Sequence, residues 1–223
     1  MNAARRQQDY FVGKARDVIQ ATCAVVSQAT AAGEMMHADL VAVSEEFRAA
    51  QAQLHRLIRS VPESRWHQRP NSARWSMAEC IEHLNLTAKA YLPLLRAALE
   101  RGRTERRLDR APRRYRRDPV GWLLWRMAGP PVRHRVKTTS AFIPSSARPL
   151  RELVAEFDRL QEEQLRCVME AEGLPLGRIW VRSPFDPRIR YNAYSCLTIL
   201  PRHQQRHVWQ AEQVAAALER AAR

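Results

Sequence analysis

Glycine is scarce in this chain, with only 7 among 223 residues. Turn-rich sandwiches and folds that cradle phosphate in a glycine-rich loop therefore start at a disadvantage. Long hydrophobic runs are missing too: the longest stretch without a charge, residues 18–33, has 16 residues and several polar side chains. It is too short and too polar to span a bilayer. Gln20 interrupts the only candidate core of a secretory signal, so we expect a cytoplasmic protein.

The cysteines lack the close pairing of a zinc finger or a redox motif. Cys23, Cys80, Cys167 and Cys196 stand far apart, and no C-x-x-C occurs. Each lies in an apolar or helical stretch, and free cysteine is one of the most frequently buried residue types. We expect free, buried thiols in a reducing compartment.

Positive charge is concentrated in one segment. The net charge is +14, and residues 101–137, with 13 basic and 3 acidic residues, hold +10 of it. An arginine-rich segment of this kind binds an anionic substrate if it folds over a site, and is otherwise a solvated basic loop. The candidate substrate-binding residues are Arg113, Arg114, Arg116 and Arg117.

Two tryptophans next to the basic segment bear on its partners. Trp122 and Trp125 are three residues apart, with two leucines between them. This pattern is more typical of a hydrophobic anchor or a dimer contact than of a platform on which bases stack. It favours a homodimer, and we expect neither nucleic acid nor a membrane as a partner.

The remaining pattern is helical. Apolar residues recur at helical spacing, and Ser76 and Glu79 form an S-x-x-E capping box that predicts a helix beginning at about Met77. We expect this helix to run towards residue 101, with Pro93 as a kink or an early end. The other predicted helices cover 9–32, 38–60, 118–125, 149–172 (with Pro149 as first residue) and 193–220.

These helices predict an all-α fold. We expect a four-helix bundle with a long crossover between its second and third helices and an N-terminal helical extension over residues 1–36. The bundle domain would cover residues 37–223, and the basic, irregular crossover residues 101–148. No convincing strand-type alternation occurs anywhere in the chain.

Histidines supply the candidate chemistry. His203 and His207 are four residues apart, so they lie one turn apart on the same helical face, which apolar residues continue. Unpaired imidazoles in a core are costly, and His83, on the apolar stripe of an earlier helix, is the best third partner. Three imidazoles can share a divalent metal and leave a position open for water or substrate. The spacing alone fits packed or exposed histidines equally well.

Two strings carry a resemblance to a known family. Trp75-Ser76-Met77-Ala78-Glu79 followed by His83-Leu84 resembles the W-S-x-x-E-x-x-x-H-L motif of the DinB-like (DinB/YfiT) metal-binding four-helix-bundle superfamily. His203-Gln204-Gln205-Arg206-His207-Val208-Trp209-Gln210 resembles its closing H-x-x-R-H-x-W-Q motif. The resemblance covers about residues 40–220. It implies that His83, His203 and His207 bind a divalent metal, zinc or nickel, and it also fits a homodimer.

The resemblance also implies a kind of chemistry. Similar proteins include bacillithiol S-transferases and mycothiol-dependent maleylpyruvate isomerases, in which the metal activates a low-molecular-weight thiol. We expect a metal-dependent thiol S-transferase or a hydrolase that acts on a small molecule. The alternative is a non-catalytic, stress-related metal-binding protein whose arginine-rich segment docks an anionic partner. Glu79 is either a catalytic proton acceptor, a partner of an imidazole, or only the capping residue of its helix.

Overall fold

The computed structural model describes residues 36–105, 114–131, 138–145 and 148–222. The chain divides into two compact units, Met1–Met36 and His37–Arg223, and the elements below belong to the second unit. The helix expected over 9–32, and with it the N-terminal extension, lies outside the described residues.

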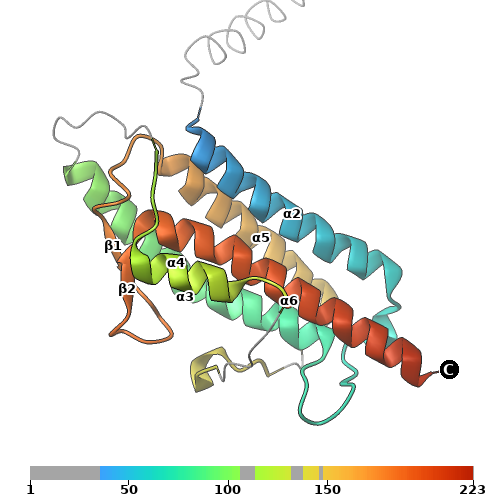
Figure 1. Ribbon diagram of the computed structural model, residues 1–223. Coiled ribbons are helices and arrows are strands. Elements are labelled where there is room, and N and C mark those ends of the chain that lie inside the picture. Colours follow the sequence, from blue (N-terminus) through green and yellow to red (C-terminus); the bar gives the residue numbers. More distant parts are fainter. Residues whose placement is uncertain (1–35, 106–113, 132–137, 146–147, 223) are drawn as a thin grey trace, which may run out of the picture. The chain divides into compact units, whose positions relative to one another are not determined.

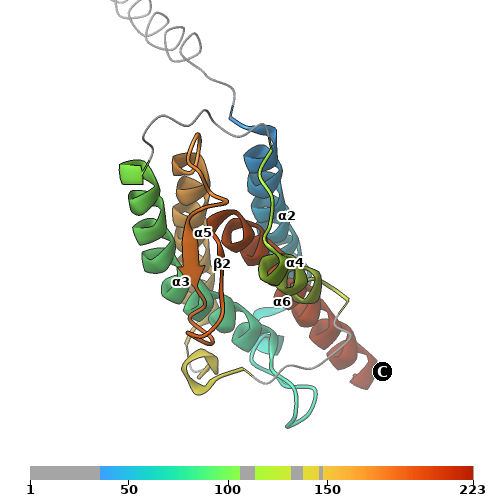
Figure 2. The ribbon, with the colours of Figure 1, turned by 60° about the vertical axis from the view of Figure 1, so that its left-hand side comes forward.

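Four long helices make up most of the described chain, and the all-α prediction is confirmed. Their bounds are Ala38–Ser60 (α2), Met77–Glu105 (α3), Leu150–Glu170 (α5) and Ala193–Ala221 (α6). The helix α3 packs against α5 and α6, and α2 packs against the same two helices. Figures 1 and 2 show the four lying side by side as a bundle.

The core forms where the apolar stripes of these helices meet. Trp66, Ile81, Leu153, Phe157 and Val208 belong to one buried hydrophobic cluster, so residues from α3, α5, α6 and the loop after α2 share it. Burial of this apolar area supplies the main free energy that holds the bundle together. Three further members of the buried interior are the free thiols of Cys80, Cys167 and Cys196, as expected, whereas Cys23 lies outside the described residues.

Helix starts follow the capping residues, and Pro93 does not bring its helix to an early end. Asn192 caps α6 by accepting a hydrogen bond from a backbone amide of the first turn. Pro93 lies inside α3, which continues to Glu105, and Pro201 lies inside α6 in the same way. Tertiary packing on several sides compensates for the backbone hydrogen bond that each proline removes. Pro149 precedes α5 as its N-cap rather than opening it.

The crossover between α3 and α5 contains ordered elements. A ten-residue helix, Pro119–Ala128 (α4), packs along α6, and a 3-10 turn, Ser140–Phe142 (η2), packs against α3 (Figure 1). Asp118 starts α4 by accepting a hydrogen bond from the Gly121 amide. In the described part of the chain, no helix is long and apolar enough to cross a membrane.

One element contradicts the expectation that the chain has no strands. The segment between α5 and α6 forms an antiparallel hairpin of Trp180–Arg182 (β1) and Arg190–Asn192 (β2), in which Val181 is opposite Tyr191. Each strand has only three residues, so neither offers enough alternation for a period of two to be recognised. Val181 and Tyr191 are buried, and β1 packs against α3.

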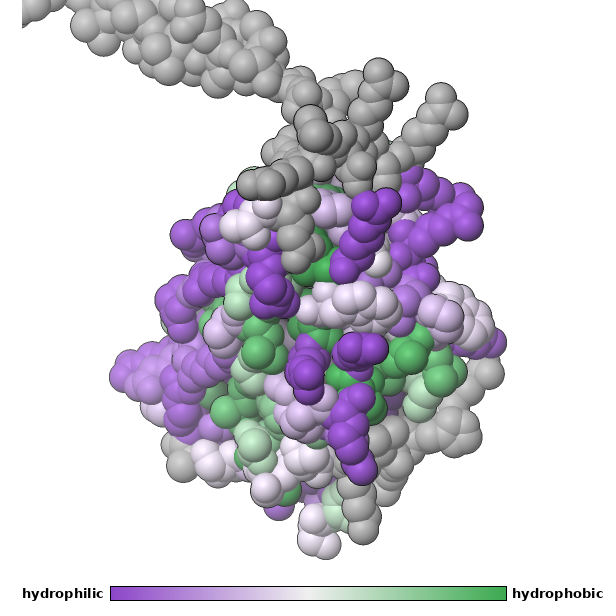
Figure 3. All heavy atoms as spheres, turned by 90° about the vertical axis from the view of Figure 1, so that its left-hand side faces the viewer, coloured by the Kyte–Doolittle hydropathy of each residue, from purple (hydrophilic) through white to green (hydrophobic). Residues whose placement is uncertain are grey.

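Hydrophobic as well as hydrophilic side chains are exposed on the surface. On the face shown in Figure 3, hydrophobic side chains gather near the middle and hydrophilic ones surround them. The helix α4 exposes about half of the surface of each of three large apolar side chains, Trp122, Leu123 and Met127.

Candidate metal centre

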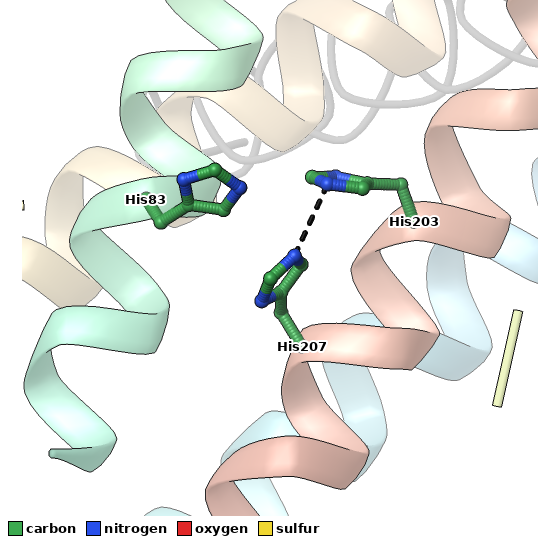
Figure 4. Close-up of side chains that lie close together, drawn as sticks. All are labelled: His83, His203 and His207. Carbon is green, nitrogen blue, oxygen red and sulfur yellow. Dashed lines mark hydrogen bonds between the residues drawn. The ribbon is translucent and has the colours of Figure 1, made fainter. Parts of the chain in front are cut away.

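The three predicted histidines converge in the interior of the bundle. His83 comes from α3, and His203 and His207 come from α6 (Figure 4). One ring nitrogen of each lies within 4.8 Å of the others. The ring centroids are 4.4 Å apart for His83 and His207 and 4.5 Å apart for His203 and His207. In the described residues this is the one group of three or more histidine, cysteine or carboxylate side chains able to hold a metal ion.

Local structure fixes where each imidazole lies. His203 and His207 are one turn apart on α6, and their Nε2 atoms are 3.1 Å apart. His83 is placed by the start of α3, where the Ser76 hydroxyl accepts from the Glu79 amide and the Glu79 carboxylate accepts from the Ser76 amide. This complete capping box sets the register of the helix, and His83 then lies one turn after the buried Glu79 and Cys80, on the same inward side.

The crossover determines which nitrogen of His83 is available. Its Nδ1 lies 2.8 Å from the carbonyl oxygen of Phe142 in η2. A carbonyl oxygen only accepts, so Nδ1 must carry the proton and donate it. The neutral ring therefore keeps its lone pair on Nε2. A backbone partner of this kind orients a histidine ligand and fixes its tautomer.

Burial keeps the three rings neutral. It lowers the pKa of His83, and it lowers the pKa of His203 and His207 well below the usual value of histidine. The neighbouring imidazoles and the positive charge of Arg206 lower the pKa of His203 and His207 further. At neutral pH each ring is therefore uncharged and offers a lone pair.

The donor set fits a divalent metal. Metal–nitrogen bonds of about 2.0–2.1 Å in tetrahedral geometry place ligand nitrogens about 3.3 Å apart. The 3.1 Å between the two α6 nitrogens is close to that spacing, and all three ligand nitrogens lie within 4.8 Å of one another. Three imidazoles fill three positions, so a fourth would stay open for an exogenous ligand.

Aromatic side chains surround the three histidines. The Trp75 ring lies 5.0 Å from His83 and 6.0 Å from His207. On another side, Phe185 from the hairpin loop lies 6.4 Å from His83 and 6.2 Å from His203, and the Phe142 ring packs 4.1 Å from that of Phe185. These rings exclude water from part of the site.

Glu79 is engaged in structural contacts. Its buried carboxylate accepts from the Ser76 amide and pairs with Arg69. Burial raises the pKa of Glu79, but these hydrogen bonds outweigh that effect and hold it below its usual value. The expectation that Glu79 caps its helix is met by the geometry, and its catalytic role stays a prediction.

The structure places two of the four candidate arginines, Arg116 and Arg117, beside the start of α6. The Arg116 carbonyl accepts from the Asn192 side chain, and the Arg117 guanidinium stacks 4.3 Å above the Trp125 ring. Asn192 precedes His203 by 11 residues, or about 16 Å along a helix. Arg114 is exposed, and Arg113 lies outside the described residues. Substrate binding by these arginines stays a prediction.

Sequence reasoning missed the phenylalanines of the site. Phe142 lies two residues before Pro144, and Phe185 directly follows Pro184, in segments otherwise interpreted as loops. A lone aromatic residue in a proline-bordered loop is a weak signal of a loop that packs inward. Nothing in the sequence indicates that the two loops meet.

One of the three comparisons with known proteins identifies a family. A scan against family models matched residues 46–211 to the DinB superfamily. The match covers well over half of the chain and includes all three histidines. Searches of curated proteins and of solved structures found no match.

Proposed function

We propose that this chain, which belongs to the DinB superfamily, is a metal-dependent enzyme that transfers a low-molecular-weight thiol to a small electrophile. The observation that carries the proposal is the convergence of three neutral imidazole nitrogens from two helices. The expected metal is zinc or nickel, both of which imidazole ligands suit. A divalent metal at this position would lower the pKa of a thiol and hold it as a thiolate nucleophile.

The surroundings of the histidines favour thiol transfer over hydrolysis. Among the described residues, no carboxylate belongs to the three-histidine group, and Glu79 is held by Ser76 and Arg69. A thiolate needs no further general base, whereas water attack usually uses one. In the transfer, the sulfur forms a bond to the electrophilic carbon, and the leaving group departs with the electron pair of the broken bond.

The first test is metal content. Plasma mass spectrometry on untagged protein should find about one zinc or nickel per chain, lost in the triple variant of His83, His203 and His207 to alanine. The single variant His207→Gln, checked for helicity, guards against loss by unfolding. His55→Ala is the matched control, because His55 pairs with Asp158 away from the site.

The second test is activity. Metal-loaded protein is screened with thiols and small electrophiles by following loss of free thiol. Turnover that disappears in His207→Gln and persists in His55→Ala supports transfer. If the protein instead hydrolyses esters or amides without consuming thiol, it is a hydrolase and not a thiol transferase. If the protein contains no metal and takes up no added zinc or nickel, the hypothesis of a metal-dependent enzyme is wrong. The alternative that then remains is a protein whose arginine-rich segment docks an anionic partner.

We also propose that the protein forms a cytoplasmic homodimer. The three described cysteines are free thiols, as expected in a reducing compartment. The exposed Trp122, Leu123 and Met127 on α4 offer an apolar contact for a second copy, whereas Trp125 is packed against the guanidinium groups of Arg117 and Arg202. Light scattering should give twice the chain mass, and Trp122→Glu should reduce it to the monomer; a wild-type monomer contradicts the dimer.

A further inference from the structure

The side chains of the histidine site differ in how far they are exposed. His83, His207 and Phe142 are buried, whereas His203, Trp75 and Phe185 are each partly exposed. Trp75 and Phe185 both contact His83 and are both reached by solvent, so a ligand that approaches His83 past either ring meets an aromatic surface.

Trp75 and Phe185 come from separate parts of the chain and approach the same histidine. Trp75 precedes α3 and lies 5.0 Å from His83, while Phe185 lies between the hairpin strands and 6.4 Å from it. Phe185 is supported by Phe142 at 4.1 Å and by Tyr91 at 6.2 Å. A ligand atom that coordinates a metal here would carry its neighbouring atoms past these rings.

Charge narrows the kind of ligand group that can lie against these rings. Aromatic faces bind either cations or flat apolar groups. Arg206 lies near enough to lower the pKa of all three histidines, and the metal adds further positive charge. A cationic group is therefore disfavoured, and a flat apolar group next to a neutral or anionic donor is favoured.

We propose that Trp75 and Phe185 determine specificity by stacking on a planar aromatic group of the small molecule that binds the metal. The inference rests on the proposed function, because it needs the metal, and it adds the substrate class. The preferred ligand has a sulfur donor next to an aromatic ring, and the rings of Trp75 and Phe185 select that ring over an aliphatic group of similar size.

The test uses cobalt(II) as the metal and three thiols as probes, and each affinity is corrected for the acidity of its thiol. Cobalt-loaded protein is titrated with benzyl mercaptan, cyclohexylmethanethiol and 2-mercaptoethanol, and binding is followed by the sulfur-to-cobalt charge-transfer absorption. We expect the benzyl compound to bind about tenfold more tightly than 2-mercaptoethanol and several-fold more tightly than the cyclohexyl compound. Phe185→Leu and Trp75→Leu, which keep an apolar side chain, should each reduce the aromatic preference about threefold to tenfold.

The controls separate the two proposals. Trp180→Ala removes an exposed aromatic ring from β1 of the same hairpin and should leave the preference unchanged. Cobalt stoichiometry and helicity are measured on every variant, so that a change in preference is assigned to the ring and not to lost metal. Absence of cobalt uptake by the wild type overturns the proposed function. Two other results would contradict only the aromatic specificity. One is cobalt uptake with equal binding of the three thiols, and the other is a loss of aromatic preference in Trp180→Ala as large as in Phe185→Leu and Trp75→Leu.

Discussion

At the scale of single residues, the start of α3 shows how one carboxylate can serve the fold beside a reactive site. Glu79 lies four residues before His83, so on sequence alone it is a candidate proton acceptor. Its carboxylate instead accepts from the Ser76 amide and pairs with Arg69. Because an N-cap sets the helix register, Glu79 positions His83 through the backbone.

This arrangement predicts that Glu79→Gln lowers stability without removing the metal. Glutamine keeps a carbonyl oxygen for the Ser76 amide but loses the charge that pairs with Arg69. We expect a loss of about 1–2 kcal/mol in the free energy of unfolding, measured with urea, with metal content unchanged. Arg69→Gln should also lower stability, because it leaves the buried Glu79 carboxylate without its charged partner. A large fall in turnover at unchanged stability would instead make Glu79 catalytic.

The tautomer of His83 is a second prediction at this scale. The Phe142 carbonyl requires a proton on Nδ1, so in metal-free protein at neutral pH His83 should be the Nδ1–H tautomer. Long-range proton–nitrogen correlation NMR distinguishes the two ring nitrogens directly, and the spectrum of His83→Gln assigns the signals. A His83 signal with the proton on Nε2 would contradict the role given to the crossover.

At the scale of elements, Asp118 joins the crossover to the bundle. Its carboxylate accepts from the Gly121 amide at the start of α4, from the Asn192 amide and from the Ser195 hydroxyl at the start of α6. One side chain therefore fixes the relative position of two helix starts. The second of these helices carries His203 and His207.

The pKa of Asp118 turns this junction into a prediction about acid stability. Burial raises the pKa of Asp118, but the three hydrogen bonds outweigh it, so the folded pKa lies below the ordinary 3.8. The contribution of the Asp118 carboxylate to stability is therefore complete above pH 3.8. It is lost as the pH falls below 3.8 towards the lower pKa that Asp118 has in the folded protein. At pH 7 we expect Asp118→Asn to cost about 2–3 kcal/mol in urea unfolding. The difference from wild type should shrink below pH 3.8; a difference independent of pH refutes this account.

At the scale of the whole molecule, local signals predicted the helices and the histidine set, but not the walls of the site. The capping box at Ser76, the apolar stripes and the four-residue spacing of His203 and His207 act within one helix, so the sequence states them directly. The contact between Phe142 and Phe185 joins two loops 43 residues apart, and the place of Arg117 against Trp125 depends on how α4 packs. Such positions follow from tertiary packing and carry no local pattern.

Metal binding should also stabilise the whole bundle, because the ligands come from two helices that separate on unfolding. A ligand that binds only the folded state, at a free concentration about 1,000 times its dissociation constant, adds about 4 kcal/mol to the free energy of unfolding. For a chain of this size, that corresponds to a rise in Tm of about 10 °C. Removal of the metal with a chelator should lower the Tm of wild type and His55→Ala by this amount, and restoring zinc or nickel should recover it. The Tm of His207→Gln should change neither on chelation nor on addition of metal, because this variant keeps only two of the three imidazole ligands. An equal response of His207→Gln would place the stabilising metal outside the three-histidine site.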